Sequence, residues 1–150
     1  MAEKRKPIDI LLAEDDEDDY LLIVEALKDS RLANRIFWVK DGEQLMDFLR
    51  RRGDYSNPEE VPLPGIILLD LNMPRKDGRE ALSEIKSDPA LRRIPIIVLT
   101  TSQAEEDILR SYDLGVNSFI RKPVQFEDFV EMVKVLGKYW FEIVELPGGH

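Results

Sequence analysis

Three acidic residues directly follow or end short apolar segments of the chain. Glu14 and Asp15 begin the run EDDEDD, and Asp70 ends the run IILLD. If these carboxylates share a pocket, each pair at about 5 Å costs roughly 3 kcal/mol at an effective dielectric constant near 20. A divalent cation removes that cost, and Mg²⁺ accepts two or three carboxylate oxygens while it keeps several waters. The three residues therefore predict a site for Mg²⁺ or Mn²⁺.

A hydroxyl group and an ammonium group follow two later apolar segments. Thr100 begins the sequence TTS, and Lys122 lies in the sequence RKP. A metal ion makes phosphoryl transfer to a carboxylate feasible because it neutralises the developing charge on oxygen. The Thr100 hydroxyl and the Lys122 ammonium would bind the remaining phosphoryl oxygens, and lysine suits this role as a point charge. The predicted chemistry is the transfer of a phosphoryl group to Asp70.

Each of these residues also has a purely structural interpretation. An acidic run before a helix caps its N-terminus and complements its dipole, which we expect of Asp18 and Asp19. Asp70 could be a turn residue, Thr100 a helix cap and Lys122 a surface lysine. Because all of them fall at the ends of four predicted strands, in the order that a site requires, we favour the functional interpretation.

The elements that position these residues alternate between strand-length apolar runs and segments with helical periodicity. The predicted strands are residues 8–13, 36–39, 66–69, 94–99 and 118–120. The predicted helices are residues 20–27, 44–49, 79–86, 105–114 and a long helix from residue 125 onward. Continuous apolar strands between helices indicate a parallel sheet covered on both faces. We expect a flavodoxin-like α/β three-layer sandwich with strand order 2-1-3-4-5, in which the first and third strands are neighbours and bring Glu14, Asp15 and Asp70 together.

Composition restricts the class of protein. The 150 residues suit one domain, which we place at residues 8–145 between tails at residues 1–7 and 146–150. The net charge of −9 argues against nucleic acid as a partner. No apolar run approaches the roughly 20 residues of a membrane span, and the N-terminus does not resemble a signal peptide. The absence of cysteine fits the cytoplasm.

The predicted last helix has more apolar surface than one packing contact needs. One stripe with helical spacing runs from Phe126 to Val144. A second stripe, about a quarter turn away, consists of Met132, Val135, Tyr139 and Ile143. The second stripe either packs under a loop or forms the interface of a homodimer, and we expect the homodimer.

The motifs EDD, LLDLNMPRKDG, LTTS and RKP, each at the end of a predicted strand, resemble those of the response-regulator receiver family. The resemblance covers residues 8–136. It implies that Asp70 is the phosphoacceptor and that Glu14, Asp15 and the backbone carbonyl of Asn72 bind the metal with it. The family usually has Asp at the position of Glu14, and this longer side chain can bind the metal through a water.

The same resemblance assigns roles to the later motifs. Thr100 and Lys122 contact the phosphoryl group, Phe119 occupies the aromatic switch position, and the Lys122–Pro123 bond is cis in the family. The long loop at residues 51–64, the segment from Lys76 to Ser102 and the sequence YWFEIVELP resemble single-domain regulators paired with bacterial phytochrome kinases. This implies a sensor histidine kinase of the phytochrome class as partner, a homodimer, and no enzymatic activity beyond the chain's own phosphorylation and dephosphorylation.

Three other functions fit the sequence less well. Phosphohydrolases with an aspartate nucleophile place a general acid two residues later, where this chain has Asn72. A flavodoxin needs a phosphate-binding loop after the first strand, but here that loop is acidic and would repel phosphate. A degenerate receiver that acts only as a binding module would not need the complete set of acceptor residues found here.

Overall fold

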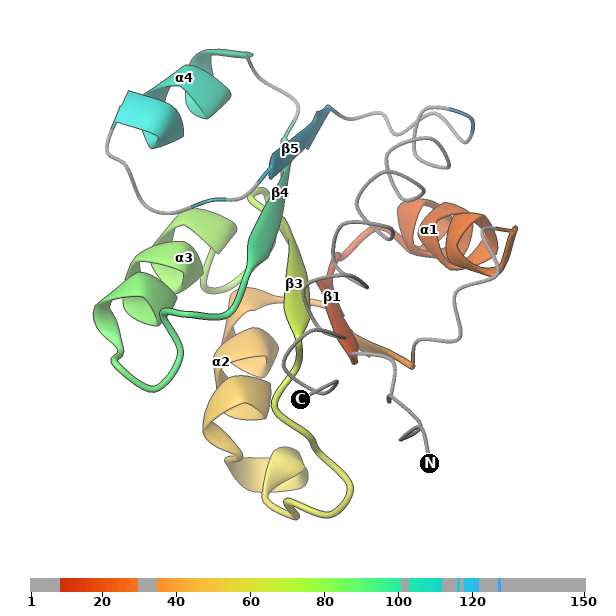
Figure 1. The fold of residues 1–150 in the computed structure, drawn as a ribbon, viewed down its shortest axis with the longest axis vertical. Helices are drawn as coiled ribbons and strands as arrows, with labels where there is room; N and C mark the ends of the chain where they lie inside the picture. The colour runs from red at the N-terminus through yellow and green to blue at the C-terminus, as the bar shows by residue number, and fades with distance from the viewer. Residues whose placement is uncertain are drawn as a thin grey trace, which may run out of the picture.

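A computed structural model of the chain describes residues 9–29, 35–100, 103–111, 116, 118–121 and 127. Within these residues, five parallel strands form one sheet in the order β2-β1-β3-β4-β5, as predicted (Figure 1). The strands are β1 (Ile10–Ala13), β2 (Ile36–Val39), β3 (Ile66–Asp70), β4 (Ile96–Thr100) and β5 (Ser118–Arg121). The carboxyl ends of β1 and β3 therefore lie side by side, which is the arrangement that the candidate site requires.

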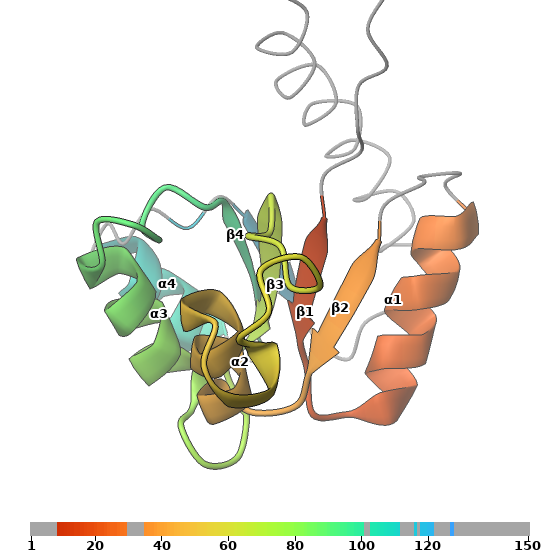
Figure 2. The ribbon, with the colours of Figure 1, turned by 90° about the horizontal axis from the view of Figure 1, so that it is seen from below.

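Helices cover both faces of the sheet and give three layers. They are α1 (Glu17–Asp29), α2 (Gly42–Arg50), α3 (Gly78–Ser87) and α4 (Gln103–Ser111), with one 3-10 turn (Gly53–Tyr55) in the predicted loop after α2. Helix α1 lies on one face, whereas α2, α3 and α4 lie on the other (Figure 2). The predicted last helix, with Met132, Val135, Tyr139 and Ile143, lies outside the described residues. Among the helices that the structure describes, none combines the length and apolarity needed to cross a membrane.

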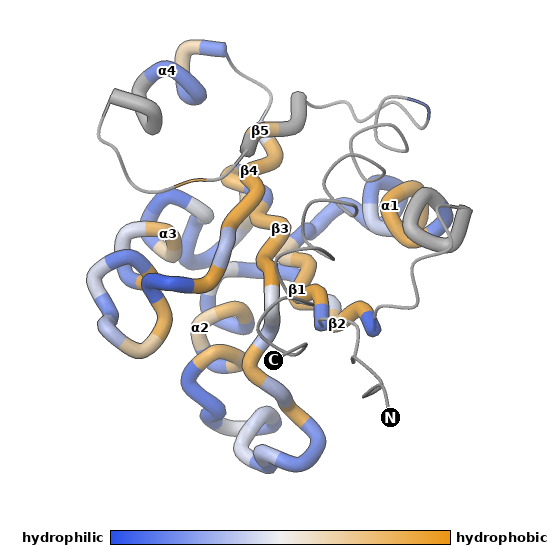
Figure 3. The backbone as a smooth tube through the Cα atoms, in the orientation of Figure 1, coloured by the Kyte–Doolittle hydropathy of each residue, from blue (hydrophilic) through white to orange (hydrophobic). Residues whose placement is uncertain are grey.

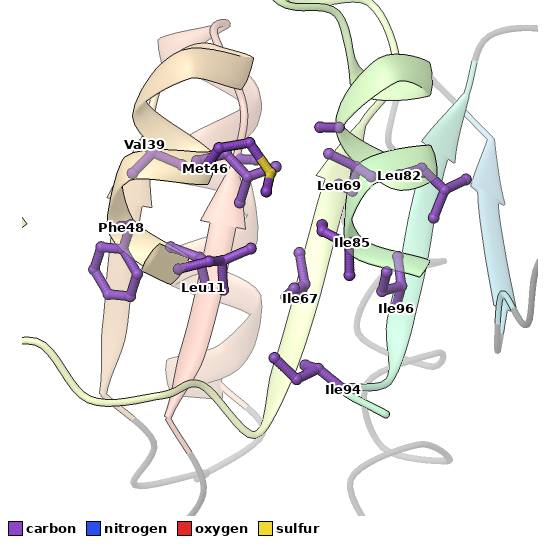
Figure 4. Packing of buried hydrophobic residues seen from close by; sticks show 14 of the residues in the cluster. Leu11, Val39, Met46, Phe48, Ile67, Leu69, Leu82, Ile85, Ile94 and Ile96 are labelled. Carbon is purple, nitrogen blue, oxygen red and sulfur yellow. The ribbon is translucent and has the colours of Figure 1, made fainter. Parts of the chain in front are cut away.

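The core consists of the central strands and the helix faces packed on them. Every residue of β1, β3 and β4 is buried, and the sheet is the most hydrophobic part of the described chain (Figure 3). Side chains of β1 and β3 pack against those of α2 and α3 in one cluster (Figure 4). Its labelled members include Leu11, Val39, Met46, Phe48, Ile67, Leu69, Leu82 and Ile85. The close packing of this core fixes the positions of the strand ends at one edge of the sheet.

Most element boundaries differ from the prediction by one to three residues, and two of these differences have identifiable reasons. Strand β4 begins at Ile96 rather than at residue 94, because Ile94 belongs to the preceding turn, where its N–H donates to the Leu91 carbonyl (3.0 Å). Helix α1 begins at Glu17, three residues before the predicted start. The Asp16 carboxylate accepts hydrogen bonds from the backbone N–H groups of residues 18 and 19 and so caps the helix. Asp18 and Asp19 lie in the first turn, where their charge complements the dipole as expected.

Candidate functional site

Three carboxylates meet at the carboxyl ends of β1 and β3. Glu14 and Asp15 follow β1, Asp70 ends β3, and Ala13 pairs with Leu69 in the register between these strands. One oxygen of each carboxylate lies within 4.8 Å of the other two. Glu14 and Asp70 are buried, whereas Asp15 is exposed to solvent. The structure thus brings Glu14, Asp15 and Asp70 together as the sequence predicts.

The geometry and chemistry of this cluster fit a small divalent cation. Mg²⁺ binds oxygen ligands at about 2.1 Å in octahedral geometry, which places neighbouring ligands about 3 Å and opposite ligands about 4 Å apart. Oxygens within 4.8 Å of one another need to approach by at most about 2 Å to share such an ion. All three donors are hard, anionic oxygens, the type that Mg²⁺ and Mn²⁺ prefer. The cluster is therefore a metal-binding acidic site.

Hydrogen bonds to the main chain orient the two buried carboxylates. The backbone N–H of Asn72 donates to Asp70 Oδ1 at 3.0 Å. The backbone N–H of Asp16 donates to Glu14 Oε2 at 3.2 Å. The main chain of Glu14 is held as well, because the indole N–H of Trp38 donates to its carbonyl oxygen at 2.7 Å. These donors stabilise the charged carboxylates in the pocket.

The loop that follows Asp70 folds back tightly onto the end of β3. The N–H of Gly78 donates to the Leu71 carbonyl (3.0 Å), and a Cβ atom at Gly78 would overlap the Asp70 carbonyl oxygen. Glycine is therefore required for this close approach. Asp77 caps α3 by accepting two backbone N–H bonds, at 2.9 Å and 3.0 Å. The Asp77 cap and the close approach at Gly78 together fix the positions of Asp70 and Asn72 at the end of β3.

Residues of the β4 side lie around the same strand ends. Thr100 ends β4, is fully buried, and lies 3.4 Å from Glu105 Oε2, to which its hydroxyl donates. Phe119 of β5 is half-buried and packs against the core cluster, in register with Val98. The predicted roles of Thr100 and Phe119 stay predictions. Lys122 and Pro123 lie outside the described residues.

Several residues around the site were not identified from the sequence. Trp38 lies between the Glu14 main chain and Tyr20 of α1, and its ring stacks on the Tyr20 ring with centroids 3.8 Å apart and planes 7° apart. Arg79 of α3 forms an ion pair with Glu105 of α4. Only the sheet order could have revealed Trp38, because β2 is the neighbour of β1. The pairing of Arg79 with Glu105 has no signal in the sequence, since 25 intervening residues separate them.

Comparisons with known proteins agree with this arrangement. The model of the response regulator receiver domain matches residues 10–134. The chain is 45% identical over 145 residues to the response regulator Rcp1 of Synechocystis sp., and the match covers 97% of each protein.

Solved structures point to the same group of proteins. The phosphorylated cyanobacterial phytochrome response regulator RcpA is 46% identical, with a TM-score of 0.78 over 91% of this chain and 95% of that one. The Mn²⁺-bound form of Rcp1 is 45% identical, with a TM-score of 0.76 over 91% of this chain and 96% of that one. With its sheet order and its acidic metal-binding site, the chain belongs to the response regulator receiver family and acts in two-component signalling.

Proposed function

We propose that Asp70 is the phosphoryl acceptor of this response regulator and that Glu14, Asp15, Asp70 and the backbone carbonyl of Asn72 hold a divalent cation beside it. The observation that supports the proposal is the convergence of three carboxylates at the ends of β1 and β3. The cation supplies positive charge that lowers the cost of bringing an anionic phosphoryl group to an anionic pocket.

The reaction follows from the chemistry of these side chains. An oxygen of Asp70 attacks the phosphorus of a phosphohistidine, the P–N bond breaks, and an acyl phosphate forms while the histidine nitrogen leaves. The hydrogen bond from the Asn72 N–H holds the carboxylate in one orientation for this attack. Thr100 and Lys122 bind phosphoryl oxygens, and Phe119 responds when Thr100 moves.

The kinase that donates the phosphoryl group is, in this proposal, a sensor histidine kinase of the phytochrome class. The support is that the RcpA relative is a phytochrome response regulator and that its similarity extends over nearly the whole chain. We place the chain in the cytoplasm, where such kinases use ATP. Its net charge of −9 disfavours nucleic acid as the target, so the signal passes through protein contacts. Phosphotransfer profiling against the histidine kinases of the source organism would identify the partner.

Acceptor identity can be tested without the kinase. With Mg²⁺ and acetyl phosphate, the wild type should gain one acid-labile and base-labile phosphoryl group, measured by mass spectrometry. Asp70→Asn should abolish the gain, because an amide is not a nucleophile for phosphorus at neutral pH. Asp18→Asn, an acidic residue of α1 outside the carboxylate cluster, is the control and should be labelled like the wild type. Labelling of Asp70→Asn at the wild-type level would overturn the assignment.

We also propose that the chain forms a homodimer through its last helix. The support is the second apolar stripe of the sequence, whose members are Met132, Val135, Tyr139 and Ile143. Replacing Tyr139 and Ile143 by lysine should give a monomer that still accepts phosphate. Sedimentation with and without beryllofluoride, a stable mimic of the phosphoryl group, distinguishes the states. A wild type that stays monomeric in both conditions would contradict the dimer.

A further inference from the structure

A chain of polar contacts connects the loop after Asp70 with the end of β4. Arg79, in the first turn of α3, lies with its Nη2 atom 3.4 Å from Asn72 Oδ1. The same nitrogen forms an ion pair with Glu105 Oε1, in the first turn of α4. The other oxygen of that carboxylate, Oε2, accepts the hydroxyl of Thr100 at 3.4 Å. Glu105 thus contacts Arg79 through one carboxylate oxygen and Thr100 through the other.

The burial of these side chains makes the contact to Thr100 significant. Thr100 is fully buried, and the side chain of Glu105 is only 24% exposed. A carboxylate only accepts hydrogen bonds, so the Thr100 hydroxyl must be the donor in this contact. A hydroxyl has one proton, and therefore it cannot donate to Glu105 and to a phosphoryl oxygen at the same time. The hydrogen bond seen here and the bond to a phosphoryl group exclude each other.

We propose that Glu105 and Arg79 are positioning residues that hold the Thr100 hydroxyl away from the phosphoryl position in the resting protein. The inference rests on the proposed function, in which Asp70 accepts the phosphoryl group and Thr100 contacts it. Arg79, whose side chain is 41% exposed, keeps the Glu105 carboxylate in place by neutralising its charge. When the hydroxyl turns to the phosphoryl group, Glu105 loses its buried donor.

This exchange gives the first turn of α4 a contact that depends on phosphorylation. Because binding free energies are reciprocal, a contact that resists the turn of Thr100 also lowers the affinity of the site for a phosphoryl group. Removal of the Glu105 carboxylate should therefore make the phosphorylated form easier to reach. Arg79 belongs to α3 and also contacts Asn72, so the loss of the Thr100 contact would be felt by α3 as well.

The test uses the full chain and beryllofluoride in the presence of Mg²⁺. Glu105→Ala should bind beryllofluoride about threefold to tenfold more tightly than the wild type, the effect of removing one charge-assisted hydrogen bond from the resting state. Its affinity for Mg²⁺ alone should stay within about twofold of the wild-type value, because the carboxylate cluster is intact. A general loss of helix stability would not give this combination. Glu106→Ala is the matched control, since it removes the same charge from the next residue, and it should leave beryllofluoride affinity near the wild-type value.

A double-mutant cycle with Thr100→Val decides the mechanism. In the Thr100→Val background the hydroxyl is absent, so Glu105→Ala should no longer change beryllofluoride affinity. An equal gain in both backgrounds, or an equal gain from Glu106→Ala, would overturn the inference in favour of a general charge effect. If the wild type binds beryllofluoride and Glu105→Ala does not differ from it, only this inference fails. If the wild type itself does not bind beryllofluoride with Mg²⁺, the proposed function fails and this inference with it.

Discussion

The two sides of the site are held by different kinds of contact. On the β1 side, Glu14 is fixed through its main chain, by the Trp38 indole at 2.7 Å and by its own N–H on the Val39 carbonyl at 3.0 Å. The Trp38 ring is in turn stacked on Tyr20. On the β4 side, the hydroxyl of Thr100 donates a long hydrogen bond of 3.4 Å to the carboxylate of Glu105.

This difference in contacts corresponds to a division of roles between metal binding and conformational switching. The main-chain and aromatic contacts of the β1 side involve no group proposed to bind phosphoryl oxygens, so we expect that side to keep its geometry in both states. A long hydrogen bond between two side chains, such as that of Thr100 with Glu105, is weak enough to be exchanged for a new one. We infer that the β1 side is built to bind the metal and that the β4 side is built to change partners.

The largest expected effect comes from Gly78, because it supports Asp70, which both sides share. In Gly78→Ala the new methyl group would overlap the Asp70 carbonyl, and the backbone must shift. We expect a loss of about 2–4 kcal/mol in the free energy of unfolding, measured with urea, together with loss of phosphorylation. Gly53→Ala is the control: Gly53 has a left-handed conformation, with φ of 58°, and a Cβ atom there would meet open space. That variant should lose only about 1 kcal/mol and keep its activity.

The next prediction concerns the electrostatic repulsion between Asp15 and the other two carboxylates when no metal is bound. Asp15 is exposed, so its repulsion with each of the other two carboxylates is about 1 kcal/mol, close to the value in water at this separation. Asp15→Asn should therefore raise the melting temperature without Mg²⁺ by about 2–5 °C. It should weaken Mg²⁺ binding at least about tenfold because one charged ligand is lost. The gain in melting temperature should shrink at 0.5 M salt, whereas Asp18→Asn should not reproduce the loss of Mg²⁺ affinity.

A lower melting temperature of Asp15→Asn with unchanged Mg²⁺ affinity would place Asp15 outside the metal site. It would also weaken the contrast between the two sides, because Glu14 would then be the one proposed metal ligand left on the β1 side. Calorimetric titration with Mg²⁺ and thermal melts in the same buffer measure both quantities.

The β1 side could largely be predicted from the sequence. Glu14, Asp15 and Asp70 are adjacent to apolar strands, and the order of strands in a doubly wound sheet places their carboxyl ends together. Contacts between neighbouring strands follow from the sheet order, so the convergence needed no side-chain detail. The element boundaries were less certain because caps decide them, as Asp16 does for α1.

The β4 side could not be predicted in the same way. Thr100 was identified by its place at the end of a strand, but its partner Glu105 lies on the following helix, whose orientation no local pattern encodes. Arg79 reaches Glu105 from a different helix, and a long flexible side chain can find many partners of opposite charge on a surface. Side-chain contacts between helices depend on packing, and packing is known only once the whole fold is formed.

The smallest single effect concerns the indole of Trp38. Trp38→Phe keeps an aromatic ring for Tyr20 but removes the donor to the Glu14 carbonyl. We expect a loss of about 1 kcal/mol in the free energy of unfolding and a twofold to fivefold weaker affinity for Mg²⁺, roughly the effect of one lost hydrogen bond. Tyr20→Leu is the matched variant, since it removes the stacked ring and leaves the donor. It should lower stability by a similar amount without changing Mg²⁺ affinity, and an equal loss of affinity in both variants would contradict a specific role of the indole N–H.

Combining the two sides in one chain tests their independence. Trp38 and Glu105 act on different groups: Trp38 holds the main chain of Glu14, and Glu105 holds the hydroxyl of Thr100. Effects of residues without shared partners add to within about 0.5 kcal/mol. In the double variant Trp38→Phe, Glu105→Ala, the weaker metal binding of the first change and the tighter beryllofluoride binding of the second should therefore add. Titration of the wild type, both single variants and the double variant measures the coupling. A coupling free energy above about 1 kcal/mol would contradict the independence of the metal side and the switching side.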